Sequence, residues 1–287
     1  MATLSMLDKG KHYEEHKDYP NMIKCYLLAI GEGNSDAMCY LANYYEDQHD
    51  EINMMKYYLM SIDCGNAEAM FDLGLYYDTQ KDYVNMLKYY VMASNCGHVE
   101  AMYNLGLYYD NQHNYPQMLL RYHMAIEKGH SIAMYNLGVY YENQKDYVNM
   151  KKYYLMAIGH EDLNAMFNLG RYYDEHTDEV DANENKIKYY SMASSKGNSF
   201  AMNNLGTYYY TKKDYVNMMK YYFLSIAQGN NVAMFNLGTY YYEQLNFQEM
   251  LKYYQMAIKN GNQDARHNLM LYYDQLKCSN GIHTQSQ

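Results

Sequence analysis

The chain has 287 residues and a formal net charge of −10, because 33 acidic residues outweigh 23 basic ones. Hydrophobic residues make up 49% of the chain. That share excludes a disordered protein, since disordered chains bury too little apolar surface to offset the entropy of ordering. The acidic balance argues against nucleic acids and anionic membranes as partners and favours basic ones.

The mean hydropathy is −0.62, and no run of apolar residues approaches the roughly 18 that a membrane span needs. Residues 1–11 lack the basic-then-apolar layout of a secretory signal. The cysteines are odd in number and form no CxxC pair, which argues against a disulfide framework or a zinc knuckle. These features predict a cytoplasmic protein with reduced thiols.

An Ala-Met pair recurs along the chain at a nearly constant interval. Successive copies lie 32 residues apart, with one interval of 36. The copies begin at Ala37, Ala69, Ala101, Ala133, Ala165, Ala201 and Ala233, and Ala265-Arg266 is a degenerate copy. A weaker first copy opens at Ser5-Met6. Such a period predicts a repeat architecture.

The copy at 101–132 shows the organisation of one repeat. Met102, Leu105 and Tyr109 follow a helical period, a polar stretch interrupts it, and a second apolar stripe follows before Gly129. Each repeat therefore predicts a pair of helices of about 11 and 13 residues. Because neither helix buries its stripe alone, successive pairs must stack on one another.

We therefore expect an all-α fold: eight helix pairs over about 5–264, a closing helix over 265–277, and a polar tail over 278–287. Residues 1–277 would form a single α-α superhelical solenoid. Met and Tyr recur at fixed columns, which indicates core positions. Of the 17 glycines, 14 fall in two columns: one allows two helices to approach closely, and the other permits a positive φ between repeats.

The residues of these repeats resemble a known family. Leu105, Gly106 and Tyr109, followed by Tyr122, resemble the tetratricopeptide signature. The stretch 122–138 is still more similar to the Sel1-like repeat, in which an aromatic pair, a small-residue pair, a Gly and an Ala lead into Leu-Gly. The resemblance covers nearly the whole chain.

The resemblance implies a right-handed solenoid in which the first helix of each pair lines a concave groove. It also implies an adaptor that gathers other proteins. The bias toward Tyr, Met, Asn and Lys resembles that of AT-rich genomes, such as those of large DNA viruses of protists. A viral origin would place the protein in the host cytoplasm.

A polar column precedes the Leu-Gly pair of each repeat. Its amide members are Asn104, Asn136, Asn168, Asn204, Asn236 and Asn268. Stacked repeats would align these amides along the groove, where each could donate to and accept from the backbone of an extended peptide. The alternative is that each Asn braces a neighbouring helix end, and the sequence leaves both interpretations open.

An acidic column lies four residues after the glycine of the same helix. We take as candidate binding residues Asp78, Asp110, Glu142 and Asp174. Tyr210 and Tyr242 interrupt the column toward the C-terminus. On the groove side these acids would favour a basic partner segment. The preferred interpretation is that they pair with a lysine column on the second helices: Lys56, Lys88, Lys152, Lys188, Lys220 and Lys252.

One motif is typical of enzymes. His12-Tyr13-Glu14-Glu15-His16 fits the H-x-x-E-H pattern of inverted zinc peptidases, where two His bind zinc and a Glu acts as base. The motif lies in the outermost repeat, where polar residues are expected in any solenoid. We expect no metal, no cofactor and no catalytic site.

The sequence thus predicts a non-enzymatic scaffold or adaptor that binds an extended, basic segment of a protein partner in its groove. One alternative is a self-assembling structural or packaging component. A remote alternative is a zinc hydrolase that uses His12 and His16. The oligomeric state stays open.

Overall fold

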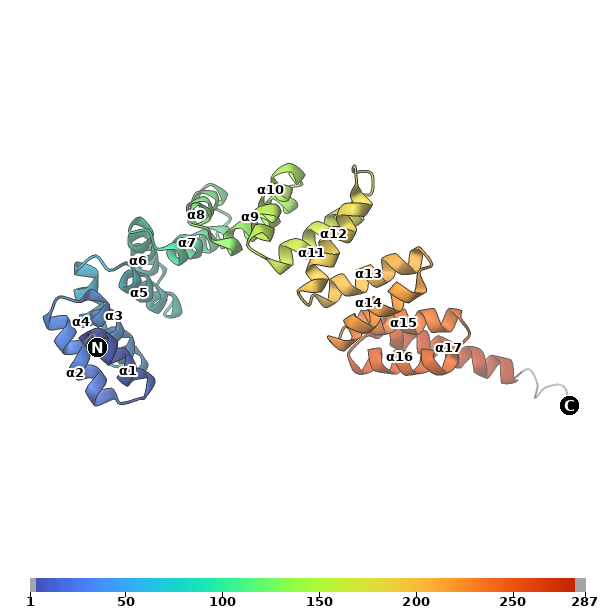
Figure 1. Cartoon of the computed structure of the whole chain (residues 1–287), viewed down its shortest axis with the longest axis horizontal. Coiled ribbons are helices and arrows are strands. Elements are labelled where there is room, and N and C mark those ends of the chain that lie inside the picture. Colours follow the sequence, from blue (N-terminus) through green and yellow to red (C-terminus); the bar gives the residue numbers. More distant parts are fainter. Residues whose placement is uncertain (1–3, 282–287) are drawn as a thin grey trace. The chain divides into compact units, whose positions relative to one another are not determined.

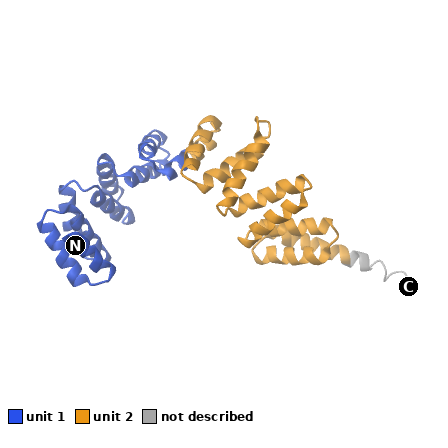
Figure 2. Ribbon diagram, viewed as in Figure 1, with its two compact units in different colours: residues 1–137 blue, residues 138–287 orange. Residues whose placement is uncertain are grey.

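The computed structural model describes residues 4–281, with side chains up to residue 276. Every regular element within these residues is an α-helix (Figure 1). The chain groups into two compact units, Met1–Leu137 and Gly138–Gln287, here called the N-terminal and the C-terminal unit (Figure 2). Helices succeed one another in antiparallel pairs, and we call the first helix of each pair the A helix and the second the B helix.

The N-terminal unit holds four complete pairs and the start of α9. Its helices are α1 (Met6–Glu15), α2 (Tyr19–Gly31), α3 (Ser35–Asp47), α4 (Glu51–Asp63), α5 (Ala67–Thr79), α6 (Tyr83–Asn95), α7 (Val99–Asn111), α8 (Tyr115–Glu127) and α9 (Ser131–Asn143). Each A helix packs on its own B helix, and α2, α4 and α6 each pack on the next A helix. This alternation is the stacking that the repeat period predicts.

The C-terminal unit contains the rest of α9 and continues the same pattern. Its helices are α10 (Tyr147–Gly159), α11 (Leu163–Glu175), α12 (Ala182–Ser195), α13 (Ser199–Thr211), α14 (Tyr215–Ala227), α15 (Asn231–Glu243), α16 (Phe247–Lys259) and α17 (Gln263–Gly281). The closing helix α17 extends four residues into the expected tail, and 282–287 lie outside the described residues.

From α3 to α15, the A helices are 13 residues long, two more than the apolar period indicates. Their N-caps explain the difference, because the capping side chain stands before the first apolar position. Asn66 accepts a hydrogen bond from the backbone N–H of Ala69 at 3.1 Å, and His98 caps α7 in the same way through Nδ1. Each cap satisfies a donor that the helix start leaves free.

The B helices begin with a reciprocal Asp-Asn pair in most repeats. Asp82 accepts from the backbone N–H of Asn85 at 3.1 Å, and the Asn85 side chain donates back to its carboxylate at 2.7 Å. Hydrogen bonds from Asn85 lower the pKa of Asp82. The residue before this cap, Lys81, has a φ of 60° and turns the chain from the A helix into the B helix.

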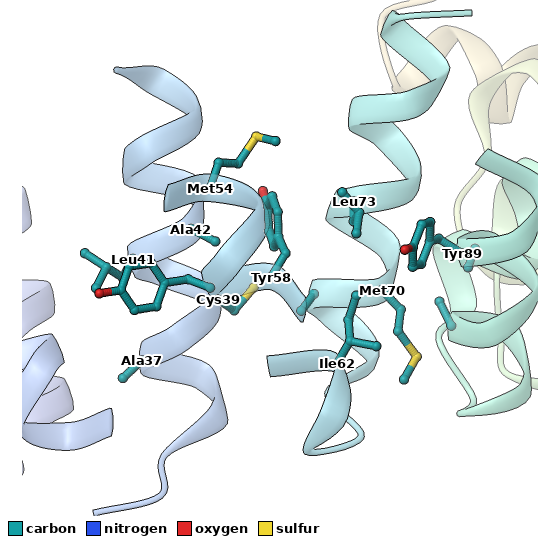
Figure 3. Packing of buried hydrophobic residues seen from close by; sticks show 14 of the residues in the cluster. Ala37, Cys39, Leu41, Ala42, Met54, Tyr58, Ile62, Met70, Leu73 and Tyr89 are labelled. Atoms are coloured by element: carbon teal, nitrogen blue, oxygen red, sulfur yellow. The ribbon is translucent and has the colours of Figure 1, made fainter. Parts of the chain in front are cut away.

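The core of each unit consists of Met, Tyr, Leu and Ala from successive helices, which confirms the core positions expected for Met and Tyr. In the N-terminal unit, Met54 and Tyr58 of α4 meet residues of α3 and α5 (Figure 3). Burial of this apolar surface between layers is the main stabilising term.

A glycine column makes the helices of each pair approach closely. A Cβ placed on Gly106 would lie 2.4 Å from the ring of Tyr122, and one on Gly138 would lie 2.4 Å from the ring of Tyr154. The second column also behaves as expected. Its seven members, which include Gly129, have φ values from 79° to 94°. Only glycine adopts such values without strain.

Candidate functional site

The predicted amide and acidic columns both lie on the A helices. Neighbouring A helices also contact each other directly, as in α3 with α5 and α13 with α15. The amides of the column are half-buried in all six positions, and among the acids Asp78 and Asp174 are exposed while Asp110 and Glu142 are half-buried. We call this surface the A-helix face of each unit.

Beneath the A-helix face lies a column of buried tyrosines from the B helices. Each of these residues is at most 2% exposed: Tyr26, Tyr58, Tyr90, Tyr122, Tyr154, Tyr190, Tyr222 and Tyr254. Each ring lies against the glycine of its A helix. The second pair, α3 and α4, has Ala42 at the position of this glycine. The hydroxyl groups therefore point toward the acidic and amide columns, where they need partners.

A glutamate in the acidic column reaches this hydroxyl. Tyr26 donates to Glu14 at 2.6 Å, and Tyr58 donates to Glu46 at 2.7 Å. Tyr154 donates to Glu142 at 2.5 Å in the C-terminal unit. These are short, charge-assisted hydrogen bonds, which are stronger than bonds between neutral groups.

An aspartate, which is one methylene shorter, does not reach as well. Tyr190 lies 3.4 Å from Asp174, and Tyr122 is instead approached by the Asn136 amide at 3.4 Å. The hydroxyl of Tyr90 has no hydrogen-bond partner among the described residues, although Asp78 occupies the acidic position of its pair.

In the last two complete helix pairs, a different residue type contacts the buried tyrosine hydroxyl. The acidic positions there are Tyr210 and Tyr242, and a threonine of the A helix takes over the hydroxyl. Thr207 lies 3.2 Å from the hydroxyl of Tyr222, and Thr239 has the same distance to Tyr254. The acidic column is thus interrupted in the two pairs in which a threonine contacts the tyrosine hydroxyl.

Several amides of the predicted column make bonds inside the protein. Asn168 donates to the hydroxyl of Tyr154 at 3.2 Å, and Asn236 donates to Asn203 at 2.9 Å. Asn203 in turn donates to Asn204 at 3.2 Å. These bonds favour the bracing role at those positions, while the peptide-binding role of the column stays a prediction.

The pairing expected between the acidic and lysine columns is wrong for the acids whose partners are known. Glu142 forms an ion pair with Arg171 of α11, and Asp174 forms one with Lys186 of α12 at 2.8 Å. The six column lysines instead place Nζ 4.7 to 5.3 Å from the ring centroid of the tyrosine that follows each of them. At that distance a cation is attracted to the aromatic face.

Pockets open on the A-helix face where the columns meet. In the N-terminal unit, Asp78, Tyr90 and Asn104 line a pocket of about 370 Å³. In the C-terminal unit, one pocket of about 190 Å³ is lined by Tyr210, Tyr222 and Asn236, and another of about 350 Å³ by Tyr242, Tyr254 and Asn268. Each pocket combines one residue of the acidic position, one buried tyrosine and one amide.

Burial controls the charge of these groups. It raises the pKa of Tyr90 to about 12, an effect that the Asn104 amide beside the hydroxyl opposes and to which the Asp78 carboxylate adds. Tyr90 is therefore a neutral donor and acceptor at physiological pH. Burial also raises the pKa of Asp110, against an opposing effect of His113, and that of Asp72, which stands in the amide column.

The His-rich motif lies on α1. His12, Glu15 and His16 are all exposed, and their potential ligand atoms lie within 4.8 Å of one another. The rings of His12 and His16 are 4.3 Å apart, and Nδ1 of His16 contacts the backbone carbonyl of His12 at 2.8 Å. Three ligand-bearing side chains on an open helix surface do not enclose a reacting substrate, which a hydrolytic zinc site requires.

Sequence reasoning did not identify the tyrosine hydroxyls as the groups around which both columns are organised. It also missed Arg171, which occupies a position where other A helices carry Leu107 or Val139. One signal was present in the sequence: the acidic column contains both Glu and Asp, and Glu gives hydroxyl bonds of 2.5 to 2.7 Å whereas Asp174 lies 3.4 Å from its tyrosine.

No helix of the described residues is both long and apolar enough to cross a lipid bilayer. No protein-family model and no curated protein matches the sequence.

The structure is similar to solved repeat proteins. A protective antigen of uropathogenic Escherichia coli that displays an SLR fold aligns with a TM-score of 0.74 at 22% identity, over 88% of this chain and 59% of that one. The chain therefore spans less than two thirds of that protein. A Sel1 repeat protein from Oxalobacter formigenes aligns with a TM-score of 0.56 at 23% identity, over 78% of this chain and 97% of that one. The fold expected from the sequence is confirmed: the described residues form successive packed α-helix pairs, the all-α solenoid fold of these solved repeat proteins.

Proposed function

We propose that this protein is a non-enzymatic scaffold that binds an extended segment of a partner protein along its A-helix face. The observation that carries the proposal is the convergence of an amide and a buried tyrosine on each pocket of that face in both units, joined by the acid Asp78 in the N-terminal unit. The Sel1-like and tetratricopeptide-like fold, which is typical of protein–protein interaction scaffolds, supports the same function.

The chemistry of the face suits a peptide backbone. An Asn side chain offers a carbonyl acceptor and two N–H donors, so that it can bond both polar groups of an extended strand without reading its side chains. The acids add a preference for basic segments, and the net charge of −10 would steer such segments toward the protein. A protein partner with a basic, extended segment fits these properties better than a nucleic acid or a membrane does.

A random-peptide library tests the proposal. We expect the protein to enrich peptides that carry basic residues, and the double variant Asn104→Ala with Asn268→Ala to bind them about tenfold more weakly. Both amides line pockets on the A-helix face. The matched control, Asn95→Ala with Asn143→Ala, removes two exposed amides from helix ends.

Circular dichroism of both double variants checks that helical content is unchanged. Equal peptide binding by the pocket variant and the control would contradict binding on the A-helix face. A library that yields no enriched peptides would also contradict the proposal.

Self-association is a second candidate function, and α17 favours it. Met270 and Leu271 of this last helix are 60% and 49% exposed, so that an apolar surface lies at the end of the stack. Light scattering over a concentration series would show a rising mass if copies associate, and Met270→Lys would reduce it. A constant monomer mass would reject this candidate.

Zinc hydrolysis is the remaining alternative, and His12 and His16 provide its test. Purified protein without added metal would contain stoichiometric zinc that His12→Ala loses. Zinc below one equivalent would reject the alternative, as the non-enzymatic proposal expects.

A further inference from the structure

The pocket between α5 and α7 in the N-terminal unit, here called the Tyr90 site, differs from its counterparts. It has a volume of about 370 Å³, and Asp78, Tyr90, Asn104 and Leu107 line it together with the rings of Tyr83 and Tyr108. Asp78 is exposed and forms no ion pair with the described residues. An accessible carboxylate therefore stands at the mouth of the pocket.

The bottom of the Tyr90 site contains an unsatisfied polar atom. Tyr90 is only 1% exposed, and its hydroxyl has no hydrogen-bond partner among the described residues. Buried hydroxyls are normally bonded, because an unmade bond costs free energy. A ligand that brings a polar group to this hydroxyl would recover that bond.

The C-terminal unit shows which group fits. At the equivalent site around Tyr154, here called the Tyr154 site, Arg171 forms an ion pair with Glu142. Arg171 directly follows the glycine of its A helix, as Leu107 follows Gly106 in the Tyr90 site. The protein thus places a guanidinium of its own beside the carboxylate in one site and a leucine in the other.

In a second site of the C-terminal unit, a lysine of the chain pairs with the acid of the column. Asp174 pairs with Lys186 at 2.8 Å, beside the hydroxyl of Tyr190. Lys186 stands four residues before Tyr190, and the residue four before Tyr90 is Met86. Both positions from which the chain supplies a cation are therefore apolar in the Tyr90 site.

We propose that the Tyr90 site binds an arginine side chain of the partner segment, with the guanidinium paired to Asp78 and donating to the hydroxyl oxygen of Tyr90. The proposal rests on the function proposed above and specifies one residue of the bound segment. A guanidinium has five donors in a planar fork, so it can bond a carboxylate and a hydroxyl together. Tyr83 and Tyr108, whose ring centroids are 6.1 Å apart, provide aromatic faces for the side chain.

A short peptide tests the proposal directly. The probe is acetyl-Gly-Gly-Arg-Gly-Gly-amide, compared with the same peptide carrying neutral citrulline in place of Arg. We expect a saturable change in the methyl NMR signal of Met86, which lines the pocket, with a Kd on the order of 1 mM. The citrulline peptide should bind at least about tenfold more weakly. Equal binding of the two peptides, or no change at Met86, would overturn the proposal.

Three variants locate the binding. Leu107→Arg supplies the guanidinium from the chain itself, as Arg171 does, and should abolish binding of the arginine peptide. Asp78→Glu should weaken binding about tenfold, because the longer carboxylate can bond Tyr90 as Glu142 bonds Tyr154. Asp78→Asn should weaken it similarly, whereas the control Asp63→Asn removes an exposed acid on α4 and should leave it unchanged. Wild-type binding by Leu107→Arg would overturn the proposal.

The outcomes separate this inference from the proposed function. If library peptides lose affinity in the Asn104 and Asn268 variant but not in Leu107→Arg, the scaffold proposal stands and the arginine site is rejected. If the arginine peptide binds the Tyr90 site and the amide variant keeps full affinity for longer peptides, the extended binding surface is rejected and the arginine site stands.

Discussion

The Tyr90 and Tyr154 sites occupy equivalent positions in their repeats, on helices of 13 residues, but the hydrogen bonding of their tyrosine hydroxyls differs. In the Tyr154 site, Glu142 accepts from the buried hydroxyl and pairs with Arg171, so that every charged group has a partner within the chain. In the Tyr90 site the acid is one methylene shorter and the arginine is a leucine, and both the hydroxyl and the acid lack such partners among the described residues. Two repeats of equal helix length can therefore differ in whether the buried hydroxyl and the acid find partners within the chain.

The two units also differ in whether the acids of the column form ion pairs. The C-terminal unit neutralises its column acids with Arg171 and Lys186, and it anchors the loop residue Glu179 to Lys151 at 2.8 Å. In the N-terminal unit, no ion pair to Asp78 or Asp110 occurs within the described residues. The N-terminal unit therefore keeps its acidic charge available for a partner.

One of the two largest expected effects concerns the close approach of an A-helix glycine to the tyrosine ring in each site. Gly138→Ala would place a Cβ 2.4 Å from the Tyr154 ring, and the ring has to shift. We expect a loss of stability of about 1–3 kcal/mol, measured by urea denaturation. The control Gly159→Ala lies at a helix end with nothing within 4 Å and should not destabilise the protein. Equal effects of the two variants would show that the close approach is not required.

Removing each hydroxyl measures the difference between the sites. Tyr154→Phe deletes a bond to a charged acceptor and should cost about 1.5–3 kcal/mol. Tyr90→Phe deletes a hydroxyl that has no partner among the described residues, so the free energy of unfolding should stay the same or rise. Similar losses in both variants would contradict the unsatisfied state of the Tyr90 hydroxyl.

Asp72 gives a pH-dependent test in the N-terminal unit. Burial raises its pKa, so that the folded state binds the proton more tightly than the unfolded chain. Stability is therefore lost as the pH rises from the unfolded value of about 4 through the folded pKa. Asp72→Asn removes this loss and should stabilise the protein at neutral pH by on the order of 1 kcal/mol, with no gain below about pH 4.

Asp82 provides the control of opposite sign. Hydrogen bonds from Asn85 lower its pKa, so its contribution is present above the unfolded pKa and disappears as the pH falls through the folded one. Asp82→Asn should therefore destabilise the protein at neutral pH but not in acid. Thermal unfolding at several pH values distinguishes the two slopes, and parallel slopes would refute the assignment.

The smallest expected effect lies in the turns that lead into the two sites. Gly97 precedes α7 with a φ of 89°, whereas Glu161 takes the corresponding place before α11 with a φ of 63°. Glu161→Gly should relieve a strain of about 1–2 kcal/mol. The greater freedom of glycine in the unfolded chain and the loss of the exposed pair with Lys196 oppose this gain, so the net stabilisation should stay below about 1 kcal/mol. Thermal unfolding measures the gain, and a lowered melting temperature would show that the turn is not strained.

The local features of the repeat could be predicted from the sequence because they depend on neighbours along the chain. The Ala-Met period set the helix pairs, and Gly129 and its equivalents predicted the positive φ between them. The core role of the Met and Tyr columns followed from helical spacing alone. The lengths of the A helices were underestimated by two residues because the capping side chains precede the apolar stripe, whereas the 13 residues expected for the B helices hold in every pair but α11–α12.

Which hydroxyls and charges find partners was decided only by the tertiary structure. Asp78 and Glu142 are similar in sequence, yet a reach of one methylene between an A helix and the tyrosine below it separates an open from a closed site. Arg171 contributes from the next pair, 29 positions away from Glu142. Spacing within one repeat contains no information on such contacts, because they depend on how two layers are stacked and on side-chain length.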